Sequence, residues 1–433
     1  MAPPRKPDEA ETADLPVPAI VAAVTRMPRL DSVDLLRGFI MIFMALDHVR
    51  DFFSYLHFPP ENMAQTWPTL FLTRWLTHFS APGFFFLAGT GAFLSLSRGR
   101  SPARLSHFLW TRGLWLVFLE MTIIGYAWTF ILSFGYGGVI WALGWSMVAL
   151  ALVVRLPLRW VAAFGAVMVA GHNLLDGIQP QMFGRLSCLW IILHQPGFIP
   201  LPQPPFIHMP PGVGFGFFVL YVLVPWIGVM ALGYAFGSVL RRSPEERQRW
   251  TLRAGVAATV LFFLLRGFNA YGNPPPVAGW IGGNGAWSVQ STLGMTLVSF
   301  FNTAKYPPGL HFLLMTLGPS LIALAWFDKL AVKQKLGAAG RFVLVFGRVP
   351  LFFYILHIYL IHSMAVVVAL AWGQPYQWLL NGGFFLGWAP PGYGHHLPFI
   401  YLIWATAIGI LYFPCKWYMD LKARRRDWWL SYI

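Results

Sequence analysis

The sequence predicts an all-α, polytopic membrane protein with about ten transmembrane helices, and three observations support this fold class. First, 57% of the 433 residues are hydrophobic and 11% are charged, whereas soluble proteins average about 25% charged residues. Second, apolar runs long enough to cross about 30 Å of hydrocarbon recur along the chain. Third, these runs are continuous and lack the alternation of barrel strands. The composition therefore excludes a soluble enzyme, a disordered chain and a disulfide scaffold.

The predicted spans form one membrane domain over residues 31–416. It follows a Pro- and Ala-rich, disordered tail over 1–30 and precedes a basic tail over 417–433. Helices are expected in the spans because lipid offers no hydrogen-bond partner to free backbone groups. We place the spans near residues 35–54, 70–96, 108–132, 137–154, 159–175, 214–240, 252–269, 309–327, 343–372 and 397–415.

The basic residues predict the orientation of these spans. Most of the 31 Lys and Arg residues lie in the tails or at alternate ends of the spans. The positive-inside rule therefore places both termini in the cytoplasm, and we expect the cell inner membrane. This distribution also explains the net charge of +15 without nucleic acid as a partner. The exceptions to the pattern are Arg50, Arg74, Arg185, Arg266 and Lys305.

Arg37 and His48 lie on one face of the first predicted helix. Their spacing is three turns plus about 20°, and about 16 Å along the helix axis. An arginine at the cytoplasmic mouth and a histidine at membrane depth suit a long, phosphate-bearing donor such as acyl-CoA. Histidine acts as a base near neutral pH and can carry an acyl group transiently. The spacing equally fits a simpler interpretation, in which Arg37 anchors the helix and His48 bonds a neighbouring helix.

Further ionisable residues lie at or near membrane depth, where such groups usually face a bundle interior or a wet cavity. Asp47 is a candidate to orient a histidine on a neighbouring helix. Arg50 and Asp51 follow it with helical spacing, which favours local ion pairs among the three. His78 precedes Ala-Pro-Gly, where a kink is expected, so it either lines a site or repairs the break.

Lys305 and Tyr306, just before the eighth span, are candidates to hold an anionic acceptor or to stabilise an oxyanion. The alternative is that they anchor this span at the interface. Asp176 and His357 are further candidates for acceptor binding, and Arg348, at an inner helix end, for donor binding. The His and carboxylate residues lack the spacing of a metalloenzyme, so we expect no metal.

Several motifs resemble one family. The stretch from Arg29 to Gly38 (RLDSVDLLRG), followed by His48, looks like the opening of the transmembrane acyltransferases. More specifically, the chain resembles bacterial members related to heparan-α-glucosaminide N-acetyltransferase, within the acyltransferase-3-like superfamily. Supporting stretches are His78 to Gly91, Val139 to Gly144, His172 to Asp176, Pro225 to Tyr234, Thr303 to Pro308, and Gly347 to Pro350 leading to His357.

The resemblance implies transfer of an acetyl or other acyl group from cytoplasmic acyl-CoA to an acceptor at the outer face. In acyltransferase-3 proteins an arginine precedes a catalytic histidine by the interval that separates Arg37 from His48. In the glucosaminide enzyme the position of His48 is an asparagine. Its working histidine follows in the first luminal loop, where His57 is the nearest counterpart. The resemblance thus nominates two different histidines.

We therefore expect an integral-membrane acyltransferase with acetyl-CoA or another acyl-CoA as donor substrate. Arg37 would hold the CoA phosphates, His48 would be the base or acyl carrier, and His57, His78 and Asp47 would complete the catalytic site. Expected partners are membrane lipid and a small-molecule or glycan acceptor, such as an amino sugar; homodimer formation stays open. The alternative is a non-catalytic transporter or scaffold that uses intramembrane His and Asp residues as a proton path.

Overall fold

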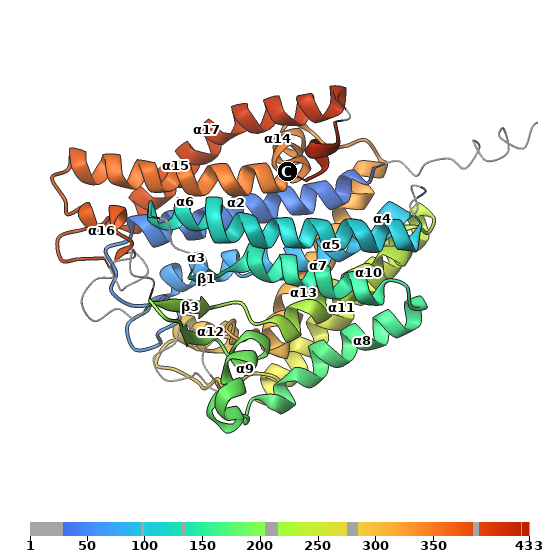
Figure 1. The fold of residues 1–433 in the computed structure, drawn as a ribbon, viewed down its shortest axis with the longest axis horizontal. Coiled ribbons are helices and arrows are strands. Elements are labelled where there is room, and N and C mark those ends of the chain that lie inside the picture. Colours follow the sequence, from blue (N-terminus) through green and yellow to red (C-terminus); the bar gives the residue numbers. More distant parts are fainter. Residues whose placement is uncertain are drawn as a thin grey trace, which may run out of the picture.

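The computed structural model describes residues 29–432, apart from 97–98, 100, 132–134, 204–214, 275–284, 384–388 and 426. The predicted tail over 1–30 lies almost wholly outside these residues. The described chain is a helical bundle (Figure 1). Its helices are α2 (Asp31–Phe53), α3 (Pro68–Thr77), α4 (Ser80–Leu96), α5 (Pro102–Leu119), a π-helical turn (Glu120–Ile124), α6 (Gly125–Thr129), α7 (Val139–Val153), α8 (Leu158–Gly171), α9 (Ser187–Leu193), α10 (Leu223–Leu240), α11 (Pro244–Gly267), α12 (Leu293–Phe301), α13 (Leu310–Val332), α14 (Ala338–Arg348), α15 (Pro350–Ala371), α16 (Gln377–Leu380) and α17 (Leu397–Arg424).

The prediction of an all-α, polytopic membrane protein is confirmed. Among the described residues, eight helical segments are long and apolar enough to cross a membrane. The segment predicted as 343–372 is divided at Val349, because Pro350 begins a new helix and has no N–H to donate. At the end of the domain, α17 continues to Arg424, beyond the predicted boundary at 416.

Two other segments differ from the predicted spans. The segment predicted as 70–96 is divided at His78, and Pro82 lies in the first turn of α4, where a missing N–H is tolerated. The segment predicted as 214–240 begins with a strand. A small sheet explains this difference: β3 (Gly216–Val219) lies between β1 (Tyr136–Gly137), to which it is parallel, and β2 (Gly197–Pro200), to which it is antiparallel.

The first described helix, α2, runs through the middle of the bundle (Figure 1). It contacts α3, α4, α13, α14, α15 and α17, and most of its residues are buried. Asp31 and Asp34 occupy its first turn, where a negative charge is favourable with the helix dipole. Because other helices surround α2, its charged residues face protein rather than lipid, which removes much of their cost at membrane depth.

Close helix crossings depend on glycine. A Cβ added at Gly38 would lie 2.2 Å from the carbonyl oxygen of Val343, and one added at Gly347 would lie 1.8 Å from that of Asp34. The backbones of α2 and α14 therefore touch, as is common between membrane helices. This contact brings the carbonyl group of Gly347 within reach of Arg37.

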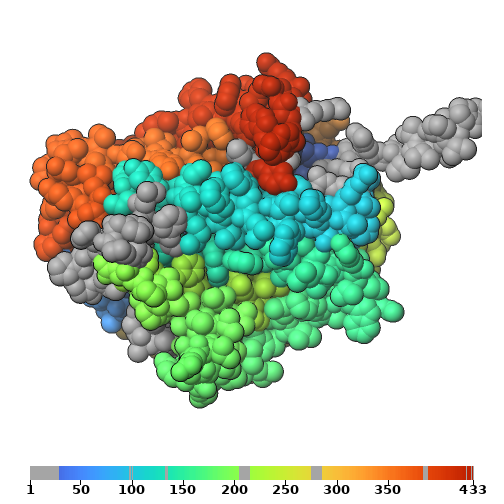
Figure 2. Space-filling view, viewed as in Figure 1, coloured from blue at the N-terminus to red at the C-terminus, as the bar shows by residue number. Residues whose placement is uncertain are grey.

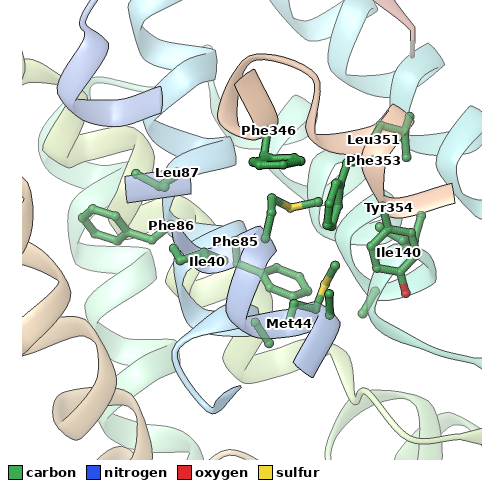
Figure 3. Packing of buried hydrophobic residues seen from close by; sticks show 14 of the residues in the cluster. Ile40, Met44, Phe85, Phe86, Leu87, Ile140, Phe346, Leu351, Phe353 and Tyr354 are labelled. Carbon is green, nitrogen blue, oxygen red and sulfur yellow. The ribbon is translucent and has the colours of Figure 1, made fainter. Parts of the chain in front are cut away.

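The bundle has a packed aromatic and aliphatic interior and an apolar outer face. Inside, the rings of Phe85 and Trp226 stack with centroids 4.6 Å apart. Figure 3 shows part of this interior around α2, with Met44 close to Phe85. Outside, α11 exposes a row of large apolar side chains, which suits contact with lipid in a membrane protein. This row contains Leu252, Val256, Val260, Leu261 and Leu264.

The two ends of the bundle differ in character, and we name them for use below. The basic end holds the beginning of α2, the end of α14 and the end of α17. The loop end holds the sheet, α3, α12, α16 and the end of α2. The functional residues predicted on α2 are therefore spread between these two ends.

Candidate functional site

A cavity of about 280 Å³ lies between α2, α4, α5, α7 and α15. Arg37 and Arg112 contribute guanidinium groups to its wall on the side of the basic end, and Tyr354 lines it deeper in the bundle. Most of the other lining residues are apolar. Figure 3 shows Tyr354 beside Ile140, another residue of the wall. The cavity thus combines cationic groups with a mostly apolar interior.

His48 and His357 form a hydrogen-bonded pair. Nδ1 of His48 lies 2.7 Å from Nε2 of His357, and Nδ1 of His357 lies 3.0 Å from the carbonyl oxygen of Phe353. A carbonyl oxygen only accepts, so in neutral rings His357 carries its proton on Nδ1 and accepts at Nε2. His48 then donates from Nδ1, and its Nε2 keeps a lone pair. Within the described part of the chain, this Nε2 has no hydrogen-bond partner.

Tyr354 connects the cavity to the histidine pair. Its ring centroid lies 6.4 Å from that of His48 and 5.3 Å from that of His357. Trp128 also packs against His48, with ring centroids 4.8 Å apart. The predicted common face of Arg37 and His48 is consistent with this arrangement, because Arg37 lies in the cavity wall and His48 lies beyond Tyr354.

The two arginines predicted to hold the donor occupy different positions. Nη1 of Arg37 donates to Asp34 at 3.0 Å and to the carbonyl oxygen of Gly347 at 3.1 Å. Asp34 also accepts hydrogen bonds from Arg29. Arg348 donates to Asp31 at 2.8 Å and is not among the residues that line the cavity. Arg37 therefore lies at the cavity, whereas Arg348 lies beside the first turn of α2.

A network of ion pairs occupies the loop end. Arg50 donates to Asp47 at 2.8 Å and to Asp51 at 2.5 Å, the local pairs that the helical spacing favours. Arg74 on α3 binds Asp47 and also Glu61, which lies in the loop between α2 and α3, at 2.7 Å. Burial alone would raise the pKa of Glu61, but Arg74, His78 and Arg50 together outweigh burial and lower that pKa below its ordinary value. Asp47 is thus held by arginines rather than by a histidine.

The other two histidines predicted to be catalytic do not join the His48 pair. His78 is buried between α3 and α4, with Nε2 3.6 Å from Oε1 of Glu61 and its ring 5.3 Å from that of Phe312. It therefore adjoins the ion-pair network. His57 is exposed in the loop after α2, and within the described residues it makes no contact with His48.

The residues predicted for the acceptor are divided among three places. Lys305 lies 5.2 Å from the ring of Tyr306, and its charge acts on Asp47 and Asp51 of the ion-pair network. The hydroxyl of Tyr306 lies 3.4 Å from that of Tyr221.

Asp176 belongs to a separate cluster at the loop end. It accepts hydrogen bonds from His194 at 3.0 Å and from Asn173 at 2.9 Å. His357, in contrast, is the partner of His48 inside the bundle. Among the described residues, groups of three or more His, Cys, Asp or Glu side chains arranged to hold a metal ion are absent.

Sequence reasoning missed the pairing of His357 with His48, the position of Tyr354, and Glu61 as a partner of Arg74. Nothing near Glu61 signals its role, because it lies in an irregular loop. Arg74 did carry a signal: it departs from the positive-inside pattern and lies in an apolar segment, where a charge needs a partner.

Comparison with known proteins agrees with the resemblance noted in the motifs. A family model described as heparan-alpha-glucosaminide N-acetyltransferase, catalytic, matches residues 29–267. This region holds Arg37, His48 and Arg112, while His357 lies outside it. No match is found among curated proteins. Because the match covers more than half of the chain, the protein belongs to the heparan-alpha-glucosaminide N-acetyltransferase catalytic family, a family of transmembrane acetyltransferases.

Proposed function

We propose that this protein transfers an acyl group, in the simplest case acetyl, from cytoplasmic acyl-CoA to a small-molecule or glycan acceptor at the outer face of the inner membrane. The observation that supports this most is the cavity that extends from Arg37 and Arg112 to Tyr354, beside His48 and His357. Guanidinium groups bind phosphates through paired hydrogen bonds. An apolar passage suits the uncharged arm that carries the thioester.

The orientation follows from the basic residues. The basic end faces the cytoplasm under the positive-inside rule, so the donor enters the cavity from the side where acyl-CoA is found. The loop end then faces outward. Lys305 and Tyr306 lie there beside the ion-pair network and are the proposed contacts of the acceptor.

In the proposed reaction, Nε2 of His48 accepts the proton of an acceptor hydroxyl or amine. The acceptor oxygen or nitrogen attacks the thioester carbonyl carbon, and the carbon–sulfur bond then breaks. The proton on Nε2 passes to the leaving thiolate, so CoA departs as a thiol and His48 returns to its neutral form. His357 keeps the other proton of His48 on Nδ1 and so maintains the lone pair on Nε2. If His48 instead carries the acyl group, the same lone pair attacks the thioester carbonyl carbon, the carbon–sulfur bond breaks and CoA leaves as a thiolate. The acceptor oxygen or nitrogen then attacks the acyl carbon, the bond from that carbon to Nε2 breaks, and the acceptor proton passes to the thiolate.

The test is acetyl transfer from acetyl-CoA, and acetyl-CoA hydrolysis, by purified protein in lipid nanodiscs. We expect His48→Ala to lower turnover by about 10²- to 10⁴-fold, the usual contribution of a general base, while CoA binding persists. His57→Ala tests the second histidine that the resemblance nominates; because this side chain is exposed in the loop after α2, we expect the variant to retain turnover. Acid quenching with radiolabelled acetyl-CoA distinguishes the two roles, because a carrier leaves labelled protein and a base does not. A folded wild-type protein that fails to bind acyl-CoA would overturn the proposal.

A further inference from the structure

Few polar side chains line the cavity, and one of them lies beside the histidine pair. The polar side chains in the cavity wall are those of Arg37, Ser95, Arg112 and Tyr354. Arg37 lies about 16 Å from His48 along the axis of α2, too far for both to contact one reacting group. The ring centroid of Tyr354, in contrast, lies 6.4 Å from that of His48 and 5.3 Å from that of His357. Tyr354 is therefore a polar group of the wall that is placed to act together with the histidines.

The hydroxyl of Tyr354 is available to a ligand in the cavity. Tyr354 lies on α15, one turn before His357, and is 3% exposed. Figure 2 shows the orange surface of α15 against the teal surface of α6, two helices that pack together. Figure 3 shows the hydroxyl oxygen of Tyr354, in red, among apolar side chains of the interior. Among the described residues, none accepts a hydrogen bond from this hydroxyl, so its proton can bond a ligand.

The chemistry of acyl transfer needs a hydrogen-bond donor at this position. Attack on a thioester moves negative charge onto the carbonyl oxygen, and an apolar cavity offers no water to solvate that charge. A donor that is fixed in place before the reaction stabilises the charge without reorganisation. The base or carrier and this donor must lie on neighbouring sides of one small space, so that both reach the same carbonyl group. The positions of His48 and Tyr354 meet this requirement.

We propose that Tyr354 is a further catalytic residue, whose hydroxyl donates a hydrogen bond to the thioester carbonyl oxygen as that oxygen becomes negative. This inference rests on the proposed acyl transfer, and Tyr354 lies beyond residues 29–267, the region that the family model matches. The hydrogen bond serves both roles of His48, because base and carrier each lead to a tetrahedral carbon with a negative oxygen. When the carbon–sulfur bond breaks, the carbonyl double bond forms again and the charge leaves with the sulfur. Tyr354 keeps its proton throughout.

The experiment compares Tyr354→Phe with Tyr359→Phe in the full chain in nanodiscs. Tyr359 is the matched control, because it lies on the same helix, is partly exposed and donates its hydroxyl proton to the carbonyl oxygen of Ile123 at 2.8 Å. We expect Tyr354→Phe to lower the turnover of acetyl-CoA by about 10²- to 10³-fold, the effect of removing one oxyanion donor. Tyr359→Phe should retain turnover.

Binding and stability separate this role from a structural one. Calorimetry should give the two variants and the wild type the same affinity for acetyl-CoA, because the charge that Tyr354 stabilises is absent before the attack. Thermal unfolding of Tyr354→Phe should match that of the wild type, since the variant keeps the ring. Equal turnover in Tyr354→Phe and Tyr359→Phe would overturn the role of Tyr354. A loss of acetyl-CoA affinity as large as the loss of turnover would also overturn it.

A second donor substrate tests the contact itself. In the dithioester analogue of acetyl-CoA, sulfur replaces the carbonyl oxygen, and sulfur accepts hydrogen bonds only weakly. This replacement should lower turnover by about tenfold more in the wild type and in Tyr359→Phe than in Tyr354→Phe, which has no donor left to lose. Such non-additivity assigns the interaction to this pair of groups. An equal decrease in all three proteins would overturn the contact.

The same measurements distinguish this inference from the proposed function. A folded wild-type protein that binds no acyl-CoA would overturn both. A wild-type protein that transfers acetyl groups, with turnover lost in His48→Ala and retained in Tyr354→Phe, would overturn only the inference.

Discussion

The two ends of α2 both place an arginine beside carboxylates, yet they differ in construction. At the loop end, Arg50 and Arg74 each bind two carboxylates, and Asp47 is shared between them. At the basic end, Arg37 shares Asp34 with Arg29 and also lines a cavity. One end is a closed network, and the other presents a cation to an internal space.

This difference separates charges that hold the fold from charges that face a ligand. A buried ion pair is by itself weak evidence of function, because its attraction mainly offsets the cost of removing both groups from water. The network at the loop end joins α2, α3 and the loop that holds Glu61. The histidine pair lies between this network of ion pairs and the cavity, where the surrounding contacts can hold a reacting group in place.

The comparison is challenged most strongly by Arg74→Ala, which leaves Asp47 with Arg50 alone and takes the arginine from Glu61. We expect a loss of about 3–5 kcal/mol in stability, as when one partner of a buried ion pair is removed. Thermal unfolding in nanodiscs measures it. Arg185→Ala, at an exposed position, is the control and should unfold like the wild type. Equal unfolding temperatures for the two variants would show that the network is not structural.

At the histidine pair, His357→Phe should lower turnover by about 10- to 100-fold, equivalent to about 1.4–2.8 kcal/mol in the barrier. His48 would keep its ring but lose the acceptor that holds its Nδ1 proton, so the pH profile of turnover should also change. CoA affinity should remain. The measurement is steady-state kinetics across pH beside direct CoA binding. Unchanged turnover and an unchanged profile would remove His357 from the site.

Two glycines of α4 test whether the cavity is the donor passage. A Cβ added at Gly91, which lines the cavity, meets nothing within 4 Å, whereas one added at Gly89 lies 2.0 Å from the carbonyl oxygen of Met230. Gly91→Leu should therefore fill the passage and abolish CoA binding with little loss of stability. Gly89→Ala should cost about 1–3 kcal/mol through overpacking but retain binding in the folded fraction. Calorimetry and thermal unfolding check both, and normal CoA binding by Gly91→Leu would contradict the passage.

The smallest effect concerns Glu61 and pH. Arg74, His78 and Arg50 together lower the pKa of Glu61 in the folded protein despite its burial. The contribution of the Glu61 carboxylate to stability is therefore present above the ordinary pKa near 4.5 and is lost as the pH falls below that value. We expect the wild type to lose about 1 kcal/mol of stability per pH unit below 4.5 from this group. Glu61→Gln should be less stable than the wild type at neutral pH, and its stability should fall less steeply as the pH is lowered. If the stability of both proteins falls equally with pH, Glu61 does not contribute to acid sensitivity in this way.

The span pattern was predictable because hydrophobic length is a local property of the sequence. The break at Val349 was visible in principle as Pro350, since proline favours the first position of a helix. Strand β3 was not predictable from its own residues, because it depends on pairing with strands that are distant in the sequence. The same limit applies to α2, whose burial is set by the helices around it.

The site was predictable only where one helix carries it. Arg37 and His48 share a face through helix geometry alone, and the local pairs of Arg50 follow from the same periodicity. His357 lies 309 residues from His48 and reaches it only because α15 packs on α2. Asp176 was grouped with the acceptor residues, but the structure places it with His194. Packing of distant segments therefore decides what the predicted residues contact.

The most direct test of the central claim is a cryo-electron microscopy structure of the wild-type protein in nanodiscs with saturating CoA. The account predicts phosphates within about 3 Å of Arg37 and Arg112, with the arm in the cavity and the sulfur next to Tyr354 and His48. CoA bound at another place, or a cavity without CoA in a saturated sample, would contradict it.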